Sequence, residues 1–402
     1  MDWPAFLTRQ TPVRKSAVRA PVEQKASLSG SVVAYAQVGK PRWTPRRYDA
    51  LAEEGFRKNV IAWRCISEVA KASASVPLLL YTEEHQELEQ HPLIELLKHP
   101  NPLQSTSQFM ESVYSYYNIA GNVYIEAIRP EDGASPVELY VLRPDRMRVI
   151  PGESGLPQGY EYQVNGRTVR WAADPITGAS NILHWKAFHP LDDWYGMAPL
   201  EAAMAAIDQH NSASAWNQAL LNQAARPSGA LIYSPKDGPS QLSDEQFRRL
   251  KEELEDHYLS PRNAGRPLIL EGGLDWKEMG LTPKDMDWLA GRKRAAQDIA
   301  LAFGVPDQLV GISEAQTFAN MAEARYMLYE ETVLPLVQQF KGALNRWLTP
   351  MFDNTLRLEI DVDEIPALAT RRDMVWDKIG KADFLTRNEK REAVGYPPET
   401  QV

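Results

Sequence analysis

The chain has 402 residues, a net charge of −9 and an ordinary globular composition, with 44% hydrophobic and 24% charged residues. A chain of this length can bury a sizeable core, and two or three modules are expected. The single cysteine, Cys65, excludes an internal disulfide, and we expect it to be an inert core residue in a reducing compartment. No run of about 18 apolar residues is present, so we expect no membrane span.

Charge is distributed unevenly along the chain. Residues 1–50 hold nine Lys and Arg and three Asp and Glu, a net charge of +6, which leaves −15 for residues 51–402. Such an acidic body argues against a protein that grips nucleic acid by neutralising its phosphates. It does not exclude a protein that surrounds DNA without holding it.

Residues 1–49 predict a flexible basic arm, because they are rich in Arg, Pro, Ser and Ala and show little periodicity. Two interpretations of the arm remain open: a disordered leader, or a tail that docks on a partner or on nucleic acid. The N-terminus lacks the basic and then apolar pattern of a signal peptide.

Residues 50–196 predict an α+β module. Apolar residues recur at helical spacing over residues 59–74, and further helices are expected at 91–97 and 107–120. Short apolar runs with turn residues between them predict an antiparallel sheet. The expected strands are residues 77–81, 123–128, 137–142, 148–150, 160–164, 168–171 and 182–185.

Residues 197–226 predict one long helix, in which only Glu201 and Asp208 are charged between residues 199 and 225. Small and amide residues fill most other positions, whereas a lone surface helix would show one apolar stripe and one charged face. Two interpretations remain open: a buried core helix, or a helix packed between copies of the chain in a ring. The residues predicted to pack there are Ala203, Ile207, Ala215, Trp216 and Leu220.

Residues 227–281 predict a small β/α insert, with strands near residues 230–233, 267–270 and 276 and a helix that begins at the capping box of residues 243–246. A unit of this size has a small core of its own. We therefore expect it to pair with a neighbouring chain.

A second helix is expected over residues 282–303, ending at Gly304. It carries the compact basic patch of Arg292, Lys293 and Arg294. These side chains spread around the helix, so they are either solvated or in contact with acidic neighbours or with the phosphates of passing DNA.

The remaining sequence predicts a polar loop at residues 304–318 and a long helix at 319–350 that is kinked at Pro335. A strand within residues 351–365 could return to the first sheet, and residues 366–402 predict two short helices.

Catalytic motifs are absent from the sequence, which has no G-x-x-x-x-G-K-[ST], G-x-G-x-x-G, H-E-x-x-H or G-x-S-x-G. We therefore expect neither catalysis nor a cofactor. A metal could bind at His184, His189, Asp192 and Asp193, or at the acidic group of residues 359–364, but neither matches a standard site. A solvated polar surface is the simpler interpretation of both.

Several short sequence segments, taken together and in their order along the chain, form a recognisable pattern. They are LLKHPNP at residues 96–102, GNVY at 121–124, LYVLRPD at 139–145, YGMAPL at 195–200, ARPSG at 225–229, LEGGL at 270–274, IALAFGVP at 299–306 and LTRNEKR at 385–391. In this order the chain resembles the portal (head–tail connector) proteins of long-tailed bacteriophages. The arm, with VVAY at 32–35 and WTPR at 43–46, is similar to the portals of gene transfer agents.

The resemblance implies a portal-like protomer with named parts. Residues 50–196 and 351–365 would form an α+β wing, and the helices at 197–226 and 282–303 a two-helix stem. The insert at 227–281 would be the clip, and residues 366–402 a helical crown. The loop at 304–318 would face the DNA channel, and the kinked helix at 319–350 would follow it.

The resemblance also implies a function. The chain would form a dodecameric ring at one capsid vertex of a virion or phage-like particle, assembled in the bacterial cytoplasm, as the channel for DNA packaging and ejection. Implied partners are double-stranded DNA, the large terminase subunit, a head–tail adaptor and the major capsid protein. The implied channel-loop residues carry one acid and no base, so repulsion or steric guidance of DNA fits better than a grip on phosphates. They are Ile312, Ser313, Glu314, Gln316 and Thr317.

Two alternatives of other classes remain. One is a metal-dependent hydrolase that uses His184, His189 and Asp192. The other is an intracellular adaptor that binds proteins and never contacts DNA. Stoichiometric metal would favour the first, and the absence of a ring and channel would favour the second.

Overall fold

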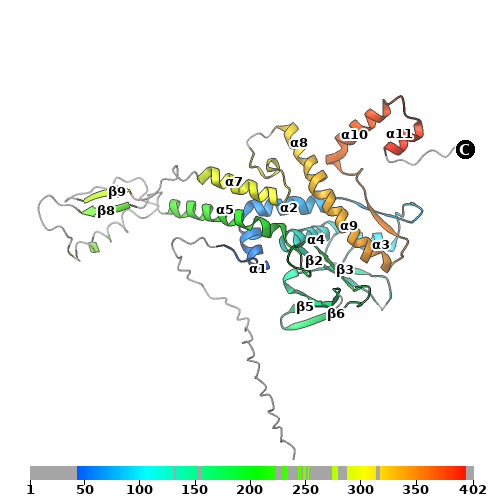
Figure 1. Cartoon of the computed structure of the whole chain (residues 1–402), viewed down its shortest axis with the longest axis horizontal. Coiled ribbons are helices and arrows are strands. Elements are labelled where there is room, and N and C mark those ends of the chain that lie inside the picture. The colour runs from blue at the N-terminus through cyan, green and yellow to red at the C-terminus, as the bar shows by residue number, and fades with distance from the viewer. Residues whose placement is uncertain are drawn as a thin grey trace, which may run out of the picture. The chain divides into compact units, whose positions relative to one another are not determined.

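The computed structural model describes residues 43–130, 133–152, 155–222, 229–233, 274–278, 288–313 and 317–394, with residues 243, 245, 248, 249 and 252 besides (Figure 1). Residues 1–42 of the predicted arm, Glu314 and Gln316 of the predicted loop, most of the insert at 227–281 and the expected start of the second helix lie outside the described residues.

Helices and small antiparallel sheets make up a mixed α+β fold, as the sequence predicts. Helical turns open the described chain, and α2 and α4 pack against each other. The bounds are α1 (Tyr48–Ala50), the π-helix η1 (Leu51–Arg57), α2 (Val60–Ala74), α3 (Pro92–Lys98) and α4 (Thr106–Ala120). The predicted helices at 59–74, 91–97 and 107–120 are confirmed. Their starts are set by the caps Asn59, His91 and Ser105.

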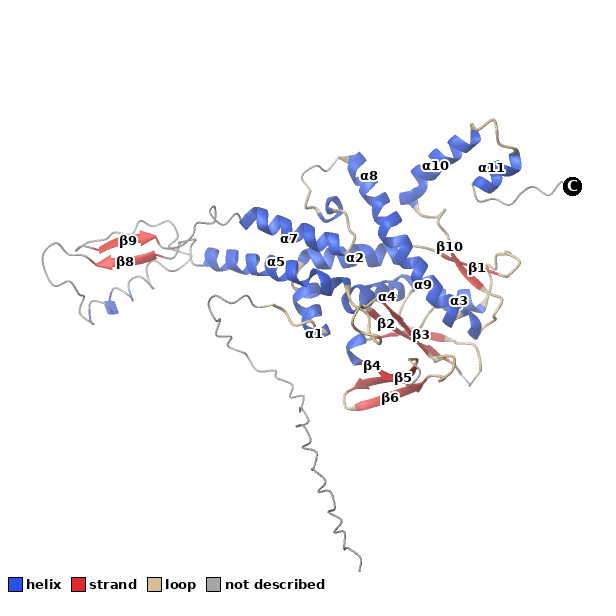
Figure 2. Ribbon diagram, in the orientation of Figure 1, coloured by secondary structure: helices blue, strands red, loops and turns tan. Residues whose placement is uncertain are grey.

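The strands divide into several sheets rather than one (Figure 2). Their bounds are β1 (Leu78–Tyr81), β2 (Asn122–Ile128), β3 (Glu138–Leu142), β4 (Met147–Pro151), β5 (Pro157–Val164), β6 (Arg167–Ala172), β7 (Ile182–Lys186) and β10 (Arg357–Ile360), with the 3-10 turn η2 (Pro144–Arg146) between β3 and β4. One sheet has the order β3-β2-β7, another β4-β5-β6, and β1 pairs with β10. All pairings are antiparallel. The prediction of one sheet was therefore wrong, because local patterns locate strands but not their partners.

The long helix α5 (Pro199–Asn222) follows β7, and α7 (Trp288–Ala302) packs along it. Between them in sequence, β8 (Gly229–Tyr233) and β9 (Leu274–Glu278) form an antiparallel pair that confirms two of the strands expected in the insert. Among the described residues, no helix is long and apolar enough to cross a membrane.

The expected helix at 319–350 is interrupted. It consists of α8 (Phe318–Met327), the π-helix η5 (Leu328–Val333) and α9 (Leu334–Trp347), flanked by the 3-10 turns η4 (Asp307–Val310) and η6 (Thr349–Met351). Pro335 stands in the first turn of α9, where a residue without N–H is tolerated, and the helix is widened directly before it. The last described elements are α10 (Pro366–Gly380) and α11 (Arg387–Ala393).

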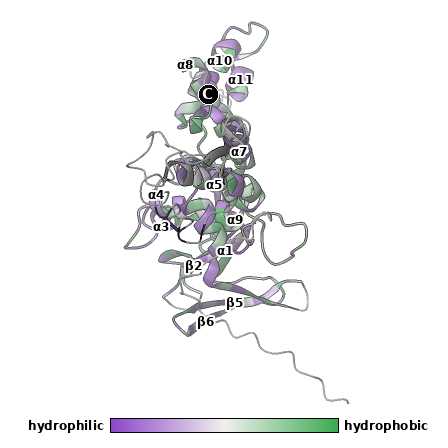
Figure 3. Cartoon of the chain, turned by 90° about the vertical axis from the view of Figure 1, so that its left-hand side faces the viewer, coloured by the Kyte–Doolittle hydropathy of each residue, from purple (hydrophilic) through white to green (hydrophobic). Residues whose placement is uncertain are grey.

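The core lies where α2, α4, α5, α7 and α9 meet the β3-β2-β7 sheet, and the helices carry both hydrophobic and hydrophilic residues (Figure 3). Tyr114 on α4, Phe340 on α9 and Trp185 on β7 contact one another edge to face or tilted. Cys65 on α2 is fully buried, which confirms the expected core position, and burial raises the pKa of its thiol to about 12. A smaller apolar cluster joins β2 to the β4-β5-β6 sheet through Tyr124 and Tyr160.

Candidate functional site

Helix α5 begins at a junction between two of the short segments, GNVY at residues 121–124 and YGMAPL at residues 195–200. Gly121 closes α4 with φ +67°, and a Cβ there would lie 2.6 Å from the carbonyl carbon of Met197. The Asn122 side chain accepts from the Gly196 amide at 2.8 Å and donates to its carbonyl at 3.1 Å. The GNVY and YGMAPL segments therefore fix where and in which direction α5 leaves the sheet.

One face of α5 is buried inside the chain. The buried positions recur at helical spacing, and Leu200 packs so closely on η1 that a Cβ at Gly55 would lie 2.7 Å from it. These buried residues are Leu200, Ala203, Met204, Ile207, His210 and Ala213. Two of the residues predicted to pack between copies, Ala203 and Ile207, thus lie in the core of the chain itself.

The opposite face of α5 is exposed and uncharged. It carries Ala202, Ala205, Gln209 and Ser212, whereas the exposed Ala215 and Gln218 lie further along the helix, on the sides of Asp208 and Leu200. Of the remaining predicted packing residues, Ala215 is thus exposed outside this face, Trp216 is half-buried, and the side chain of Leu220 lies outside the described residues. A solvent-exposed helix face without charge is suited to close contact with another surface.

A buried polar cluster joins α5, α7 and the start of α2. The Asn59 amide donates to Asn211 Oδ1 at 2.9 Å and lies 3.2 Å from His210 Nδ1. The Arg292 Nε–H donates to His210 Nε2 at 3.3 Å, and Asn211 donates to the Glu54 carbonyl at 2.9 Å. No local sequence pattern signals this cluster, because its members come from η1, the start of α2, α5 and α7.

The two ring nitrogens of His210 face the Asn59 amide and the Arg292 Nε–H. Burial first, and the Arg292 charge second, lower the pKa of His210 below its usual value. The polar cluster therefore joins α5 to α7 through a histidine whose charged form is disfavoured.

The predicted basic patch on α7 has partners within the chain. Arg292 is bonded to His210, and Arg294 pairs with Asp298 one turn on at 3.2 Å. Arg294 keeps 73% of its side chain exposed, so its pair is a weak surface one. Contact of this patch with DNA or with a neighbouring copy stays a prediction.

The predicted channel loop follows α7 through a tight turn. Gly304 has φ +63°, and its carbonyl accepts from the Thr332 hydroxyl at 2.7 Å. Ile312 is partly buried against the core, and the Thr317 hydroxyl caps α8 by accepting from the Asn320 amide. Both described ends of the loop are thus fixed by the body of the chain.

The proposed metal ligands have structural partners instead. His184 stacks on Tyr124 with ring centres 4.4 Å apart and donates to Asn122 Oδ1 at 3.1 Å. His189 Nδ1 accepts a hydrogen bond from the Leu191 amide, and Asp192 Oδ1 accepts from the amides of Trp194 and Tyr195. Among the described residues, no group of three or more His, Cys, Asp or Glu side chains could hold a metal.

The acidic group after β10 is likewise engaged locally. Glu359 pairs with the buried Lys341 at 2.7 Å, and Asp361 accepts from the amides of Asp363 and Glu364. The Asp363 carboxylate lies 3.4 Å from Arg372 on α10. This group therefore orders the turn between β10 and α10.

The comparison with protein families gives one match over most of the chain. Residues 61–395 match the family described as "Phage portal protein". This range holds α2 to α11 and every strand of the described sheets.

Curated relatives match nearly their full length. A Rickettsia bellii protein described as "Uncharacterized protein" is 41% identical over 345 residues, covering 86% of this chain and 88% of that protein. The "Portal protein" of Enterobacteria phage HK97 is 24% identical over 392 residues, covering 93% of this chain and 85% of that protein.

Solved structures from gene transfer agent (GTA) particles are also similar. A chain of "Neck of empty GTA particle computed with C6 symmetry" has a TM-score of 0.71 at 45% identity, covering 93% of this chain and 100% of that chain. A chain of "Neck of native GTA particle computed with C12 symmetry" has a TM-score of 0.68 at 45% identity, covering 90% and 96%.

Proposed function

This chain belongs to the phage portal protein family, and from that premise we propose that twelve copies of it form a ring at one vertex of a GTA-like or phage capsid. The ring is the channel through which double-stranded DNA enters and leaves. Portal proteins are structural components of virions, and the chain has no nucleotide-binding motif, so a separate ATPase must drive the DNA.

The observation that carries this proposal is the likeness to the GTA neck. At 45% identity over 93% of this chain and 100% of that chain, both the fold and most surfaces that depend on it are expected to be shared. The C12 symmetry of the related native neck supports a ring of twelve.

The parts of the protomer receive roles on this basis. Residues 50–196 and 351–365 form the wing, the helices at 197–226 and 282–303 the stem, and residues 227–281 the clip. The loop at 304–318 lines the channel and is followed by the long helix at 319–350. Residues 366–402 form the crown, and residues 1–49 the arm. The clip is the docking site for the terminase and later for the head–tail adaptor, and the wing contacts the major capsid protein.

Within the ring, the uncharged exposed face of α5 contacts the neighbouring copy. This face carries Ala202, Ala205 and Ser212, whose small side chains allow close approach of another helix. The charged residues Glu201 and Asp208 lie on another side, tied to Arg46 at 3.5 Å and to Thr44 at 2.5 and 2.9 Å. The helix is thus divided into a core face, a face that holds residues 43–47 and a free face.

DNA passes without sequence readout. The acidic body repels phosphates, and the cations of α7 have partners inside the chain, so few of them remain to neutralise a polyanion. Ile312, Ser313 and Thr317 stand at the fixed ends of the channel loop, which guides the duplex sterically.

Native mass spectrometry of the purified chain tests the ring. We expect a species of about 545 kDa, twelve times the 45.4 kDa of one chain. Ala205→Trp should give folded chains by circular dichroism without that species, whereas Ala205→Ser should assemble normally. Rings from Ala205→Trp would show that another face of α5 makes the contact. ATP hydrolysis by the pure protein would count against the whole proposal.

A further inference from the structure

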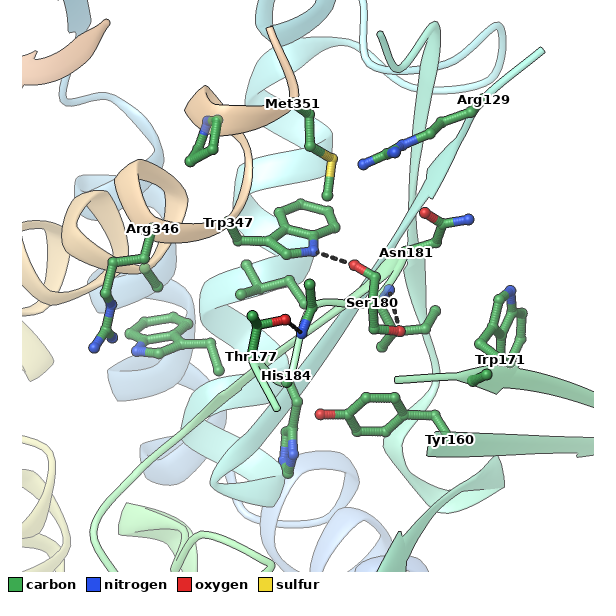
Figure 4. A pocket seen from close by; sticks show the side chains of 18 of the residues that line it. Arg129, Tyr160, Trp171, Thr177, Ser180, Asn181, His184, Arg346, Trp347 and Met351 are labelled. Atoms are coloured by element: carbon green, nitrogen blue, oxygen red, sulfur yellow. Dashed lines mark hydrogen bonds between the residues drawn. The ribbon is translucent and has the colours of Figure 1, made fainter. Parts of the chain in front are cut away.

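A cleft of about 1100 Å³ lies beside β7, outside the helices to which the ring is assigned (Figure 4). All five residues of β7 line it, together with the end of β6, the loop at residues 177–181 and the C-terminal turn of α9. It is large enough to hold an extended peptide of several residues.

The strand β7 presents an open edge to this cleft. β7 pairs with β2, and the Ala127 amide donates to the Asn181 carbonyl while the Ala187 amide donates to the Gly121 carbonyl. Along an antiparallel strand, successive residues direct their backbone N–H and C=O groups alternately toward one neighbour and away from it. Since Asn181 and Ala187 bond to β2, the backbone groups of Ile182, His184 and Lys186 point away from β2. Among the described residues no strand pairs with that side, and the Ser180 hydroxyl takes the Ile182 N–H at 3.2 Å.

Two other sheet edges of the body are capped. At the outer edge of β3, the Leu139 amide donates to the Pro100 carbonyl and the Leu139 carbonyl accepts from the Asn101 side chain. At the outer edge of β10, the Asn345 side chain bonds both the amide and the carbonyl of Leu358 at 2.7 and 2.9 Å. An open strand edge that faces a cleft, unlike these two, is a docking position for another strand.

The cleft is strongly cationic. Its described lining residues include the four cations Arg129, Arg170, Lys186 and Arg346 and no carboxylate. Arg170 pairs with Glu161 at 2.8 Å, and the Lys186 ammonium donates to the Asp193 carbonyl. The Nε of Arg129 is buried and has no hydrogen-bond partner among the described residues, and Figure 4 shows this side chain reaching into the cleft.

Aromatic side chains form the two walls. Trp347 on α9 donates from Nε1 to the Ser180 carbonyl at 2.9 Å, which holds one wall in place. Tyr160 and Trp171 lie on the other side of the cleft, and Trp171 is held by Glu126 at 3.0 Å. A strand added to β7 would direct alternate side chains toward these two walls.

We infer that this cleft binds an extended, acidic segment of a partner protein, which adds to β7 as an edge strand. The alternation of outward N–H and C=O groups matches a peptide backbone, whereas DNA phosphates only accept hydrogen bonds. The arm of this chain fits poorly, since residues 1–42 carry seven Lys and Arg and two Asp and Glu. Charges at the edge also discourage pairing with neutral strands, so they select an acidic partner.

The test uses a fluorescent peptide of alternating Val and Glu, seven residues long, on the full chain. We expect saturable binding by anisotropy, with slower hydrogen exchange of the His184 and Lys186 amides. The peptide with Lys in place of Glu, and the acidic peptide N-methylated at alternate residues on one edge, should not bind. The double variant Arg129→Ala, Arg346→Ala should weaken binding at least ten-fold.

Matched controls separate the proposal from general charge effects. Arg148→Ala and Arg167→Ala remove exposed cations of the neighbouring sheet outside the cleft and should leave binding unchanged. Glu131→Gln with Asp132→Asn, next to the cleft in sequence, should not weaken it. Absence of saturable binding, binding that survives N-methylation, or displacement by a DNA duplex or by a peptide of residues 26–42 would each overturn the inference. None of these outcomes depends on ring formation.

Discussion

Two helices of 15 residues, α2 and α10, differ completely in their surroundings. In α2, seven residues are buried, and Cys65 and Ile66 have no exposed surface. In α10, no residue is buried, and Met374, Val375 and Trp376 are 64%, 48% and 40% exposed. Its first turn is held by Ala367 and Leu368, which pack against the core, and beyond that turn Arg371 pairs with Glu323 at 2.8 Å and lies 3.8 Å over the Tyr326 ring.

The contrast shows that α2 is packed within the single chain, whereas most of α10 is not. An isolated helix of about this length is marginal in water, so most helical stability comes from tertiary packing. α2 obtains that packing from α4, α7 and α9. α10 has such packing at its first turn alone, through Ala367 and Leu368, and under our proposal its exposed apolar residues are covered by neighbouring crown helices in the ring.

The largest expected effect is in the core. Ile66→Ala on α2 removes a fully buried side chain, so the free energy of unfolding should fall by about 2–5 kcal/mol. The matched Val375→Ala on α10 should change the unfolding of the unassembled chain by less than about 0.5 kcal/mol. Urea unfolding of both variants measures the difference, and equal losses would contradict the contrast.

Removal of the N-cap residue should likewise destabilise the chain more at α2 than at the exposed C-terminal helix α11. Asn59→Ala removes a buried cap that also bonds Asn211 and contacts His210, so we expect a loss of about 2–3 kcal/mol. Thr386→Ala removes the exposed cap of α11 and should cost about 0.5–1 kcal/mol, seen as fraying of that helix alone. Thermal unfolding and hydrogen exchange of the two variants distinguish these outcomes.

Acid should destabilise the body through His184. Burial first, and the Lys186 charge second, lower its pKa to about 3, against about 6.5 in the unfolded chain. Between these values the unfolded chain binds more protons, so stability is present above pH 6.5 and is lost as pH falls, by about 2 kcal/mol at pH 5.

The variant His184→Phe isolates this contribution. It keeps an aromatic ring against Tyr124 but cannot titrate, so the wild-type loss between pH 7 and pH 5 should exceed the variant loss by about 2 kcal/mol. Denaturant unfolding at both pH values measures it. Parallel curves for the two proteins would show that His184 is not held neutral in the fold.

A variant of α10 with the smallest expected effect on the unassembled chain tests most closely whether this helix is packed only in the ring. Trp376→Ser should change the unfolding of the unassembled chain by less than about 0.5 kcal/mol. In the assembled ring it should lower the dissociation temperature, because its apolar surface is then in contact with a neighbour. An equal effect in both states would mean that α10 is packed within its own protomer.

Elements with strong local signals could be predicted from the sequence, and those that depend on distant partners could not. Asn59 and Ser105 are followed by apolar periodicity, so α2 and α4 were predicted closely, and Gly121 marks the end of α4. The split into several sheets, the π-helices η1 and η5 and the core face of α5 arise from tertiary contacts.

The same limit explains the predicted site residues. Arg292 is a surface cation by local pattern, but His210, 82 positions earlier, holds its Nε. His184 alternates with Leu183 and Trp185 on β7, which places it on the face of the β4-β5-β6 sheet, and that period-two signal could have identified it as a packed residue. The family resemblance supplied the function, which no single residue of the chain carries.

Electron microscopy of the purified chain tests the central claim most directly. We predict closed rings with twelvefold symmetry and a central opening wide enough for a DNA duplex. The β8–β9 strand pairs should lie at one end of the ring, and α10 and α11 at the other. Rings without an opening, or chains that never assemble and are absent from the capsid vertex in whole particles, would contradict the portal function.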